Sequence, residues 1–405
     1  MKIGIYGGSF NPPHLGHQNA AIEAAKKCGL DKLLLIPAGI PPHKMMEQGS
    51  PANEHRLAMT RLMGAQAALQ SGVEVETLDL EMRREGKSYT VDTLRTLRRQ
   101  YPNDELMLFM GTDMFFSFDT WRAPEEIAGL ARIVAFYRNE SDNVAAFAAQ
   151  AERLTARFRG KGFGTLALDR VIEVSSTELR EGMRSDASEK MLEPQVYGYI
   201  LREHLYGTDL DLKRLTVQQL RPIALSYLKA KRCAHVLGTA ATAVKLAEKY
   251  GADVHKAEVA GLLHDCTKKL SMPEQLALCA KYGIALDELE QKALKLLHAK
   301  TGAALARDVF GVDDDIYGAI LWHTTGKPDM TVLEKVIYLA DFIEPTRDFP
   351  GVDALRETVW QDLDRGLLMG LEMTVAEMEE MGNPIHGNTL AARDYLKGKT
   401  NEGKA

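Results

Sequence analysis

The sequence has 405 residues, a formal net charge of −6, 45% hydrophobic residues and 26% charged residues. This length exceeds one ordinary core and predicts two domains. The composition is that of a soluble globular protein, and the negative charge argues against a nucleic-acid partner with a large phosphate footprint. No apolar run approaches the roughly 20 residues of a membrane span. Four cysteines without a C-x-x-C spacing predict reduced thiols and a cytoplasmic location.

Up to about Tyr206 the pattern alternates between strands and helices. Continuous apolar runs at 33–36 and 106–110 are typical of strands covered on both faces. Asn53 and Thr90 are the expected N-caps of helices over 54–70 and 91–100. The alternation predicts an α/β doubly wound parallel sheet that binds its ligand at the carboxyl ends of the strands. Strands are predicted at 2–6, 32–37, 73–79, 105–110, 132–137 and, more weakly, 171–174.

The most informative segment is Gly-Gly-Ser-Phe-Asn-Pro-Pro-His-Leu-Gly-His at 7–17. It follows the first strand and opens a helix that runs to about Lys27. Gly7 and Gly8 allow backbone N–H groups to approach a phosphate, and the helix N-terminus adds partial positive charge. His14 and His17 are three residues apart, so both side chains point the same way. The segment predicts a binding site for a nucleoside triphosphate.

Two segments further along carry groups suited to this ligand. His43 and Lys44 follow the second strand in a Pro-Pro loop, where cations could meet phosphate, although exposed charges on such a turn are common. The segment 88–94, Ser-Tyr-Thr-Val-Asp-Thr-Leu, reads by itself as a capped helix start that includes Thr90.

Polar groups also follow later strands of the predicted sheet. Gly111 and Asp113 come after the fourth strand, at the end where doubly wound folds bind ligands. Trp121 packs in a core or stacks on a pyridine ring. The segment 174–180 combines hydroxyl groups at a helix start with Arg180 one turn in, which suits triphosphate oxygens.

The segment 7–17 resembles the His-x-Gly-His nucleotidyltransferases, and its Ser-Phe-Asn-Pro-Pro version is similar to bacterial nicotinate mononucleotide adenylyltransferase. The resemblance covers residues 1 to about 206 and implies a Rossmann-like fold, ATP with Mg²⁺, and nicotinate mononucleotide as acceptor. It implies catalytic roles for His14, His17, Lys44 and Arg180. It implies nucleotide contacts from Gly7, Gly8, Ser9, Phe10, His14, His17, His43, Lys44, Thr90, Gly111, Asp113, Trp121, Ser175, Ser176, Thr177 and Arg180.

Two details bear on this resemblance. His55 stands before Arg56, where relatives usually carry an acidic residue. Pantetheine-phosphate adenylyltransferases, the nearest alternative, usually have Thr or Ser before a single Gly in the first loop and lack the segment at 88–94. The comparison favours the nicotinate branch.

After Tyr206 the pattern becomes helical. We predict a first domain at 1–208, a linker at 209–214, a helical domain at 215–397 and a polar tail at 398–405 that frays. Glycines 251, 283 and 311 stand where helix C-caps are expected. The predicted helices cover 216–229, 231–250, 255–266, 272–282, 286–310, 313–323, 331–344 and 353–381.

The helical half carries six residues that can bind metal, mostly within strongly apolar helices. A single histidine of this kind is more often a core residue, but several together indicate a metal centre, because buried imidazoles and carboxylates are costly without a metal or a partner. The six residues are His235, His264, Asp265, His298, His323 and Asp341.

Their order resembles the two-metal branch of the His-Asp (HD) phosphohydrolases. The strings at 262–265, 322–326 and 339–349 look like the bacterial symmetrical diadenosine tetraphosphate hydrolases, over about 215 to 395. The resemblance implies one metal on His235, His264, Asp265 and Asp341, and a second on Asp265, His298 and His323. Iron is the metal that the family suggests, although the donors also suit Mn, Co or Zn. Lys268 would contact a phosphate, as would Arg347, although Lys268 also reads as part of a solvated basic face with Lys269.

The sequence thus predicts a bifunctional enzyme. One domain would make deamido-NAD from ATP and nicotinate mononucleotide, and the other would hydrolyse diadenosine tetraphosphate to two ADP. Two alternatives stay open for the helical half: another nucleotide phosphoester as substrate, or a nucleotide-sensing module without hydrolysis. No nucleic-acid or membrane partner is expected, and a homo-oligomer is left open.

Overall fold

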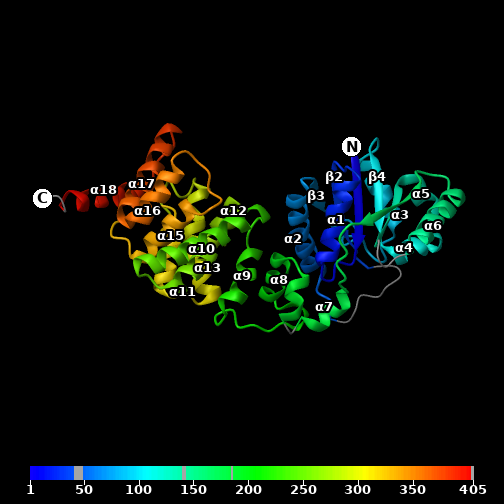
Figure 1. Cartoon of the computed structure of the whole chain (residues 1–405), viewed down its shortest axis with the longest axis horizontal. Coiled ribbons are helices and arrows are strands. Elements are labelled where there is room, and N and C mark those ends of the chain that lie inside the picture. The colour runs from blue at the N-terminus through cyan, green and yellow to red at the C-terminus, as the bar shows by residue number, and fades with distance from the viewer. Residues whose placement is uncertain (41–48, 139–142, 184–185, 403–405) are drawn as a thin grey trace. The chain divides into compact units, whose positions relative to one another are not determined.

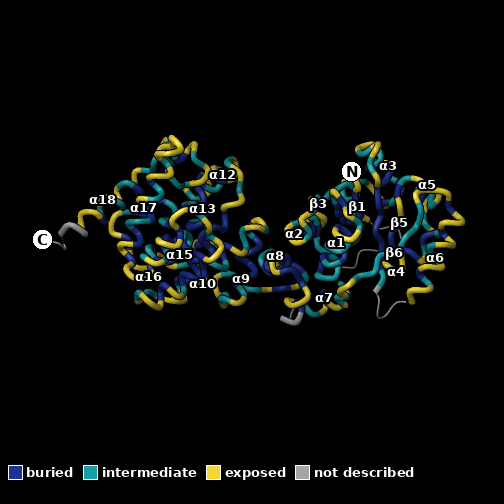
Figure 2. The backbone as a smooth tube through the Cα atoms, turned by 45° about the horizontal axis from the view of Figure 1, so that its top comes forward, coloured by how far each residue is buried: buried dark blue, intermediate teal, exposed yellow. Residues whose placement is uncertain are grey.

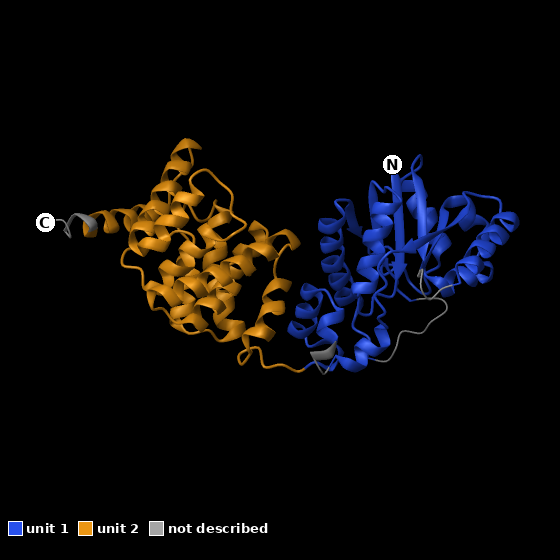
Figure 3. Cartoon of the chain, in the orientation of Figure 1, with its two compact units in different colours: residues 1–208 blue, residues 209–405 orange. Residues whose placement is uncertain are grey.

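The computed structural model describes residues 1–40, 49–138, 143–183 and 186–402. The chain forms two compact units, Met1–Thr208 and Asp209–Ala405, shown in different colours in Figure 3. Buried backbone is concentrated inside each unit (Figure 2). Each unit has its own hydrophobic core, and each is described separately below.

Unit 1 contains a six-stranded sheet in the order β3-β2-β1-β4-β5-β6. All five strand pairings are parallel, which confirms the doubly wound sheet. The order reverses at β1 and β4, and ligands bind such folds at the carboxyl ends of the strands beside that point. The strands are β1 Lys2–Gly8, β2 Lys32–Pro37, β3 Glu74–Thr77, β4 Glu105–Met110, β5 Arg132–Arg138 and β6 Phe163–Leu168.

Helices cover both faces of this sheet (Figure 1). Ile3 and Ile5 of β1 share a core with Val91 and Leu94 of α3 and with α5 and α6. On the other face α1 and α2 contribute buried alanine and methionine side chains. The α-helices are α1 Leu15–Lys27, α2 Asn53–Ser71, α3 Thr90–Gln100, α4 Thr112–Phe116, α5 Pro124–Leu130, α6 Val144–Arg157, α7 Ser176–Gly182 and α8 Pro194–Arg202; 3-10 turns lie at Phe118–Thr120, Asp186–Met191 and Leu205–Gly207.

The sixth strand differs from the sequence-based prediction. The chain at 171–174 is irregular, and β6 lies at Phe163–Leu168 instead, paired with β5. The β-branched residues at 171–174 suggested a strand, but this segment packs along α1: Asn19 donates to the carbonyl of Arg170, and the carbonyl of Ile172 faces Gly16. The true edge strand contains glycine and threonine and is only half-buried, so its apolar signal is weak.

Two expected N-caps lie one position off. The caps of α2 and α3 are Ala52 and Tyr89, neither of which makes a side-chain capping bond. Asn53 is instead the first helical residue, and its Oδ1 accepts a hydrogen bond from Arg56 at 2.6 Å. The Asn53 side chain therefore bonds to Arg56 and does not form the helix cap that the sequence pattern had predicted.

Unit 2 consists of helices, as predicted. Gly251, Gly283 and Gly311 end α10, α12 and α13 in the left-handed conformation, which confirms these C-caps. The α-helices are α9 Val217–Ser226, α10 Cys233–Tyr250, α11 Val254–Leu263, α12 Met272–Tyr282, α13 Leu294–Phe310, α14 Asp314–Trp322, α15 Val332–Ile343, α16 Val352–Gln361, α17 Leu363–Glu380 and α18 Gly387–Glu402; a 3-10 turn lies at Ala230–Arg232.

Three predicted helix boundaries in unit 2 were wrong. The helix expected from 286 begins only at Leu294. Asp287 and Glu290 form a separate turn before it, in which the carboxylate of each residue accepts the backbone N–H of the other. The helix expected over 353–381 breaks at Asp362, whose extended backbone and carboxylate cap α17. The polar tail predicted at 398–405 begins inside α18, which extends to Glu402. Within the described residues, no helix is both long and apolar enough to cross a membrane.

Candidate functional sites

The first site is built on the start of α1. His14 is the N-cap, and its Nδ1 accepts the backbone N–H of His17 at 3.4 Å. The Nδ1 of His17 accepts the backbone N–H of His14 at 3.3 Å in return. Because both Nδ1 atoms act as acceptors, the proton of each neutral ring lies on Nε2. The capping box thus fixes the tautomer of two adjacent imidazoles, whose centroids are 3.7 Å apart.

Burial keeps both rings neutral. It lowers the pKa of His14 to about 4. Burial, and then the neighbouring His14, lower the pKa of His17 well below its ordinary value. Near pH 7 the pair therefore offers two Nε2–H donors rather than two cations. Such donors bind a phosphate oxygen through hydrogen bonds, and an approaching anion favours their protonation.

The lowered pKa of His14 makes stability depend on pH. The unfolded chain binds a proton at this residue below about pH 6.5, whereas the folded chain does so only below about pH 4. Unit 1 is therefore expected to lose stability as the pH falls from 6.5 toward 4. Urea denaturation followed by Trp121 fluorescence, with Trp322 and Trp360 changed to phenylalanine, measures this. His14→Asn is expected to flatten the dependence, and His204→Asn, at an exposed position, is the control.

The loop before α1 is anchored by Arg56, which the sequence analysis gave no role. This side chain is 1% exposed, and its guanidinium donates to the carbonyls of Ser9 and Ala38, both at 2.8 Å. It thereby joins the loops that follow β1 and β2. A charged residue on the same helical face as Met59 and Met63 is the signal that could have identified it.

Asn11 links this loop to the end of the unit. Its carbonyl accepts from Arg180 at 2.6 Å, its Oδ1 accepts from the Tyr206 hydroxyl at 2.8 Å, and its amide donates to Ser50. Arg180 also donates to Thr177 at 2.9 Å. The guanidinium is therefore held beside the loop that carries the two histidines. Tyr206 was not predicted, and its long sequence separation from Asn11 leaves no local signal.

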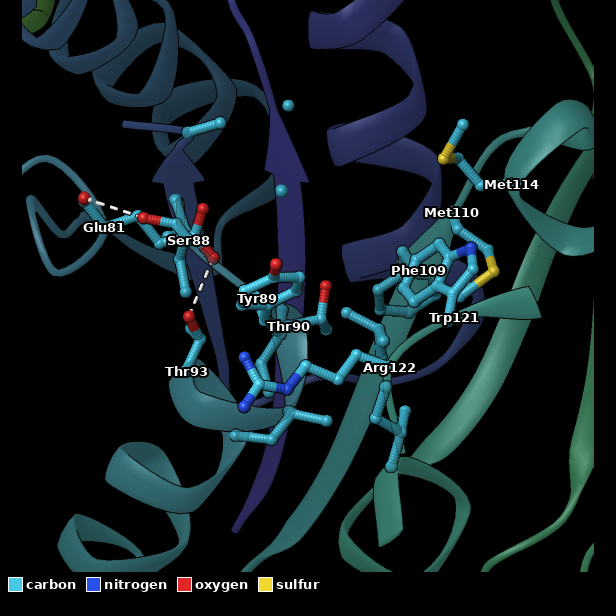
Figure 4. Close-up of a pocket in the computed structure, with 18 of the residues that line it drawn as sticks. Glu81, Ser88, Tyr89, Thr90, Thr93, Phe109, Met110, Met114, Trp121 and Arg122 are labelled. Carbon is cyan, nitrogen blue, oxygen red and sulfur yellow. Dashed lines mark hydrogen bonds between the residues drawn. The ribbon is translucent and has the colours of Figure 1, made fainter. Parts of the chain in front are cut away.

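A cavity of about 330 Å³ opens at the carboxyl ends of β1 and β4 (Figure 4). Trp121 lies on one side of it, with Tyr89 and Thr90 opposite. Several lining residues were not predicted as site residues, among them Glu81, Tyr89 and Arg122. The predicted residues among its lining are Gly7, Gly8, Ser9, Thr90, Gly111 and Trp121.

The remaining predicted residues of this site lie elsewhere. Phe10 is fully buried with its ring under Gly8, so it supports the loop. Asp113 is exposed and does not line the cavity. Ser175 caps α7 by accepting from Thr177 and Glu178, and Ser176 is the first residue of that helix. His43 and Lys44 lie outside the described residues.

The second site gathers all six predicted metal-binding residues in unit 2. They come from five helices: α10, the end of α11, α13, the end of α14, and α15. Five of the six side chains are at most 6% exposed, and Asp341 is 15% exposed. Two groupings have ligand atoms close enough for a shared ion: His235 with His264 and Asp341, and His264 with Asp265 and His323.

Asp265 divides the cluster into two sides. Its Oδ2 lies 3.5 Å from His264 Nε2 and 3.9 Å from His235 Nε2. Its Oδ1 lies 3.3 Å from His298 Nε2 and 3.9 Å from His323 Nε2. One carboxylate therefore faces two imidazole pairs through different oxygens, the arrangement of a bridging ligand.

Two buried atoms of this cluster have no hydrogen-bond partner among the described residues: His264 Nε2 and Asp265 Oδ1. Burial alone would raise the pKa of Asp265, but the neighbouring His264 and His298 hold it well below the ordinary value. A charged carboxylate with an orphaned oxygen is costly in a protein interior unless a cation meets it. The N and O donors fit divalent metals such as Fe, Mn, Co or Zn.

The outer nitrogens of three of the four ligand histidines donate to protein acceptors. His264 Nδ1 donates to the Gly261 carbonyl at 2.7 Å, and His323 Nδ1 donates to the Ile320 carbonyl at 2.6 Å. His235 Nδ1 donates to Glu344, a carboxylate with 0% exposure, at 3.0 Å. In the neutral rings of these three histidines the proton therefore lies on Nδ1, and Nε2 is the nitrogen that can bind a metal. Glu344 was not predicted as part of the site.

Glu344→Gln is expected to weaken metal binding by about 10- to 100-fold, because the carboxylate orients the His235 ring through its Nδ1–H. Equilibrium titration of the metal-free protein with Mn²⁺ measures the effect. Glu248→Gln, at an exposed position in α10, is the control. Unchanged Mn²⁺ affinity in Glu344→Gln would contradict this role.

Three cations surround the centre. Lys268 Nζ lies 3.0 Å from His298 Nε2 and 3.9 Å from Asp265 Oδ1, so its ammonium group reaches the centre, although the side chain is 36% exposed. Arg232 pairs with Asp265, and Arg347 with Asp341. Arg232, which was not predicted, immediately precedes α10. Positive groups at the rim of an acidic cluster suit a polyphosphate substrate.

Comparisons with known proteins agree with the division into two units. Residues 5–182 match the cytidylyltransferase-like family model, and residues 232–346 match the HD domain model. A protein of Geobacter sulfurreducens named "probable nicotinate-nucleotide adenylyltransferase" is 35% identical over 221 residues, which cover 52% of this chain and all of that protein. The symmetrical bis(5'-nucleosyl)-tetraphosphatase of Bacillus subtilis is 39% identical over 170 residues, covering 42% of this chain and 91% of that protein.

A solved structure from Clostridium acetobutylicum, described as a predicted HD superfamily hydrolase involved in NAD metabolism, is 41% identical. The match covers 46% of this chain and 98% of that chain, with a TM-score of 0.45. The relatives therefore align with one half of this chain each, at nearly their full length. The chain belongs to the nicotinate-nucleotide adenylyltransferase family in its first unit and to the HD family of symmetrical bis(5'-nucleosyl)-tetraphosphatases in its second.

Proposed function

We propose that unit 1 transfers the adenylyl group of ATP to nicotinate mononucleotide, giving deamido-NAD and pyrophosphate. The observation that carries this proposal is the pair of buried, neutral imidazoles at the start of α1, together with a cavity that contains Trp121 and is lined by Gly7, Gly8 and Ser9 of the preceding loop. The imidazole pair offers hydrogen-bond donors for phosphates, and the cavity offers an aromatic surface for a pyridine ring.

In this proposal the mononucleotide phosphate attacks the α-phosphorus of ATP directly, and pyrophosphate leaves. His14 and His17 donate from Nε2 to the phosphate oxygens, and Arg180, held by Asn11, adds a guanidinium. Lys44 and His43 would join them, and Ser175, Ser176 and Thr177 would lie near the adenine and the triphosphate. A bound Mg²⁺ would neutralise charge on the phosphates. The protein contributes alignment and fixed donors, and no covalent intermediate is required.

The test uses the full chain with ATP, Mg²⁺ and nicotinate mononucleotide. Pyrophosphate and deamido-NAD are expected in equal amounts. Pantetheine phosphate as the acceptor is the comparison, and adenylyl transfer to it alone would overturn the assignment.

For unit 2 we propose symmetrical hydrolysis of diadenosine tetraphosphate to two ADP. The observation that carries this is Asp265, whose two oxygens face separate imidazole pairs. His235, His264, Asp265 and Asp341 would hold one divalent metal, and Asp265, His298 and His323 a second, with iron the metal expected. Metals bound there would lower the pKa of a bound water and so supply the nucleophile. Lys268 and Arg347 would bind the phosphate chain and stabilise its charge as the P–O bond breaks.

Incubating the full chain with Fe²⁺ or Mn²⁺ and diadenosine tetraphosphate tests this proposal. ADP as the sole nucleotide product is expected. A mixture of ATP and AMP would contradict symmetrical cleavage. Metal binding without any product would favour the nucleotide-sensing module, and cleavage of other phosphoesters alone would favour a different substrate.

A further inference from the structure

The four ligand histidines of unit 2 are not held in the same way. His235, His264 and His323 each donate Nδ1–H to a protein acceptor, which orients the ring itself. The Nδ1 of His298 has no such acceptor in the described part of the chain, and the Lys268 ammonium group 3.4 Å from it can only donate. The position of the His298 ring therefore depends on how the backbone of α13 is held.

A buried threonine holds that backbone. Thr267 is 0% exposed and follows Asp265 by two residues, in the turn after α11. Its hydroxyl donates to the carbonyl of His298 at 3.0 Å. The imidazole of that same residue faces the turn, with His298 Nε2 3.3 Å from Asp265 Oδ1. The turn that carries one metal-binding residue is therefore bonded directly to the backbone of another.

Two further buried side chains keep Thr267 in place. Thr301 lies one turn after His298 in α13, and its hydroxyl is 2.9 Å from that of Thr267. Gln275 of α12 is 1% exposed, donates to the carbonyl of Thr267 at 2.7 Å and accepts from the hydroxyl of Thr301. A buried polar network whose members are all bonded is rigid. The network therefore braces the turn against α13.

This brace acts on one of the two proposed metal positions. The position on Asp265, His298 and His323 takes a ligand from α13. The other position takes its ligands from α10, the end of α11 and α15, and none from α13. The α13 position also offers fewer protein ligands, so it is expected to fill second. A displacement of α13 should therefore weaken the second binding step and leave the first one intact.

We infer that Thr267 is a positioning residue for the metal position that includes His298, and that its hydroxyl determines whether the centre retains two ions. The inference rests on the two-metal centre proposed for unit 2 and adds the residue that maintains its second position. Thr267 acts through the carbonyl of His298. Without the hydroxyl, α13 is no longer bonded to the turn at this point, and His298 is no longer held within reach of an ion shared with Asp265.

The experiment titrates the metal-free full chain with Mn²⁺. Calorimetry gives the two binding steps, and electron paramagnetic resonance reports whether two Mn²⁺ ions lie close enough to couple. The parent is expected to bind two ions and to give the spectrum of a coupled pair. Thr267→Val keeps the branched shape without the hydroxyl. It is expected to weaken the second step by about 10-fold, to leave the first within about twofold, and to diminish the coupled spectrum.

Three further variants separate positioning from folding. Thr267→Ser keeps the hydroxyl and is expected to restore the second step and the coupled spectrum. Thr358→Val removes a hydroxyl that bonds within α16 and is expected to change neither step. Gln275→Met removes the bond from α12 to Thr267 but leaves the hydroxyl, and it is expected to weaken the second step by less than Thr267→Val. Gln275→Met also provides the test if the valine variant does not fold.

Equal weakening of both binding steps in Thr267→Val and Gln275→Met would overturn the inference, because Thr267 would then serve the fold alone. A second step in a folded Thr267→Val within about twofold of the parent would overturn it as well. A parent that binds fewer than two Mn²⁺ ions per chain refutes the proposed two-metal centre itself. A parent that binds two ions, with a second step that does not depend on Thr267, refutes the inference alone.

Discussion

Asp265→Asn is expected to lower the hydrolysis of diadenosine tetraphosphate by at least about 10³-fold. The carboxylate is fully buried, and its two oxygens face different imidazole pairs. Asparagine keeps the shape but replaces one oxygen with an NH₂ group, which cannot ligate a cation, and it removes the negative charge. Both metal positions should therefore weaken together. The measurements are ADP release and bound metal per chain.

The chain supplies its own control for this variant. Adenylyl transfer by unit 1 is expected to remain unchanged, which separates loss of the centre from loss of folded protein. Asp308→Asn removes a partly exposed carboxylate of α13 and should retain hydrolysis. If Asp265→Asn kept both its metal content and near-parental ADP release, Asp265 would not be a bridging ligand.

The sequence predicted the metal-binding residues well, because charged and imidazole side chains are unfavourable at buried positions of apolar helices. His264, Asp265 and His323 stand within strongly apolar helices, and only a common partner makes such placement tolerable. The spacing of helices then brought all six metal-binding candidates together. The sequence could not predict the residues that hold the metal-binding side chains in place. Glu344 bonds to His235 across more than a hundred residues of sequence. Its local sequence is that of any glutamate at the end of a helix.

The strand at β6 shows a second limit. Val171 and Ile172 have strong β-propensity, but no neighbouring strand is available to them, whereas the weaker segment at Phe163–Leu168 pairs with β5. Propensity describes how a residue fits a sheet, not whether the sheet has a free edge there. Local sequence also fails to predict Arg122 and Tyr206 as site residues. The position of Arg122 depends on the left-handed turn at Ala123, and that of Tyr206 on its contact with Asn11.

His17 allows a sharper test of the adenylyl transfer proposed for unit 1, because its two ring nitrogens have different hydrogen-bonding roles. Nδ1 caps α1 by accepting from the His14 backbone, whereas Nε2–H is the donor proposed for phosphate. Asparagine can reproduce the Nδ1 acceptor but does not reach the Nε2 position. His17→Asn is therefore expected to retain stability but to lower adenylyl transfer by about 10²- to 10³-fold, the cost of removing one fixed donor from a phosphate site.

Glutamine differs from asparagine here, because its side-chain amide reaches toward the Nε2 position and can also accept from the N-cap backbone, as Gln219 does at the same position of α9. His17→Gln is therefore expected to retain more activity than His17→Asn and to keep the stability of the helix start. Steady-state kinetics and urea denaturation of both variants give the two readouts, and diadenosine tetraphosphate hydrolysis by the same preparations reports intact protein. Equal activity loss in both variants, tracking stability, would mean that His17 serves the helix and not the phosphate. Loss of activity in His17→Asn without loss of stability would show that the helix cap and the phosphate donor are separate roles of the two ring nitrogens.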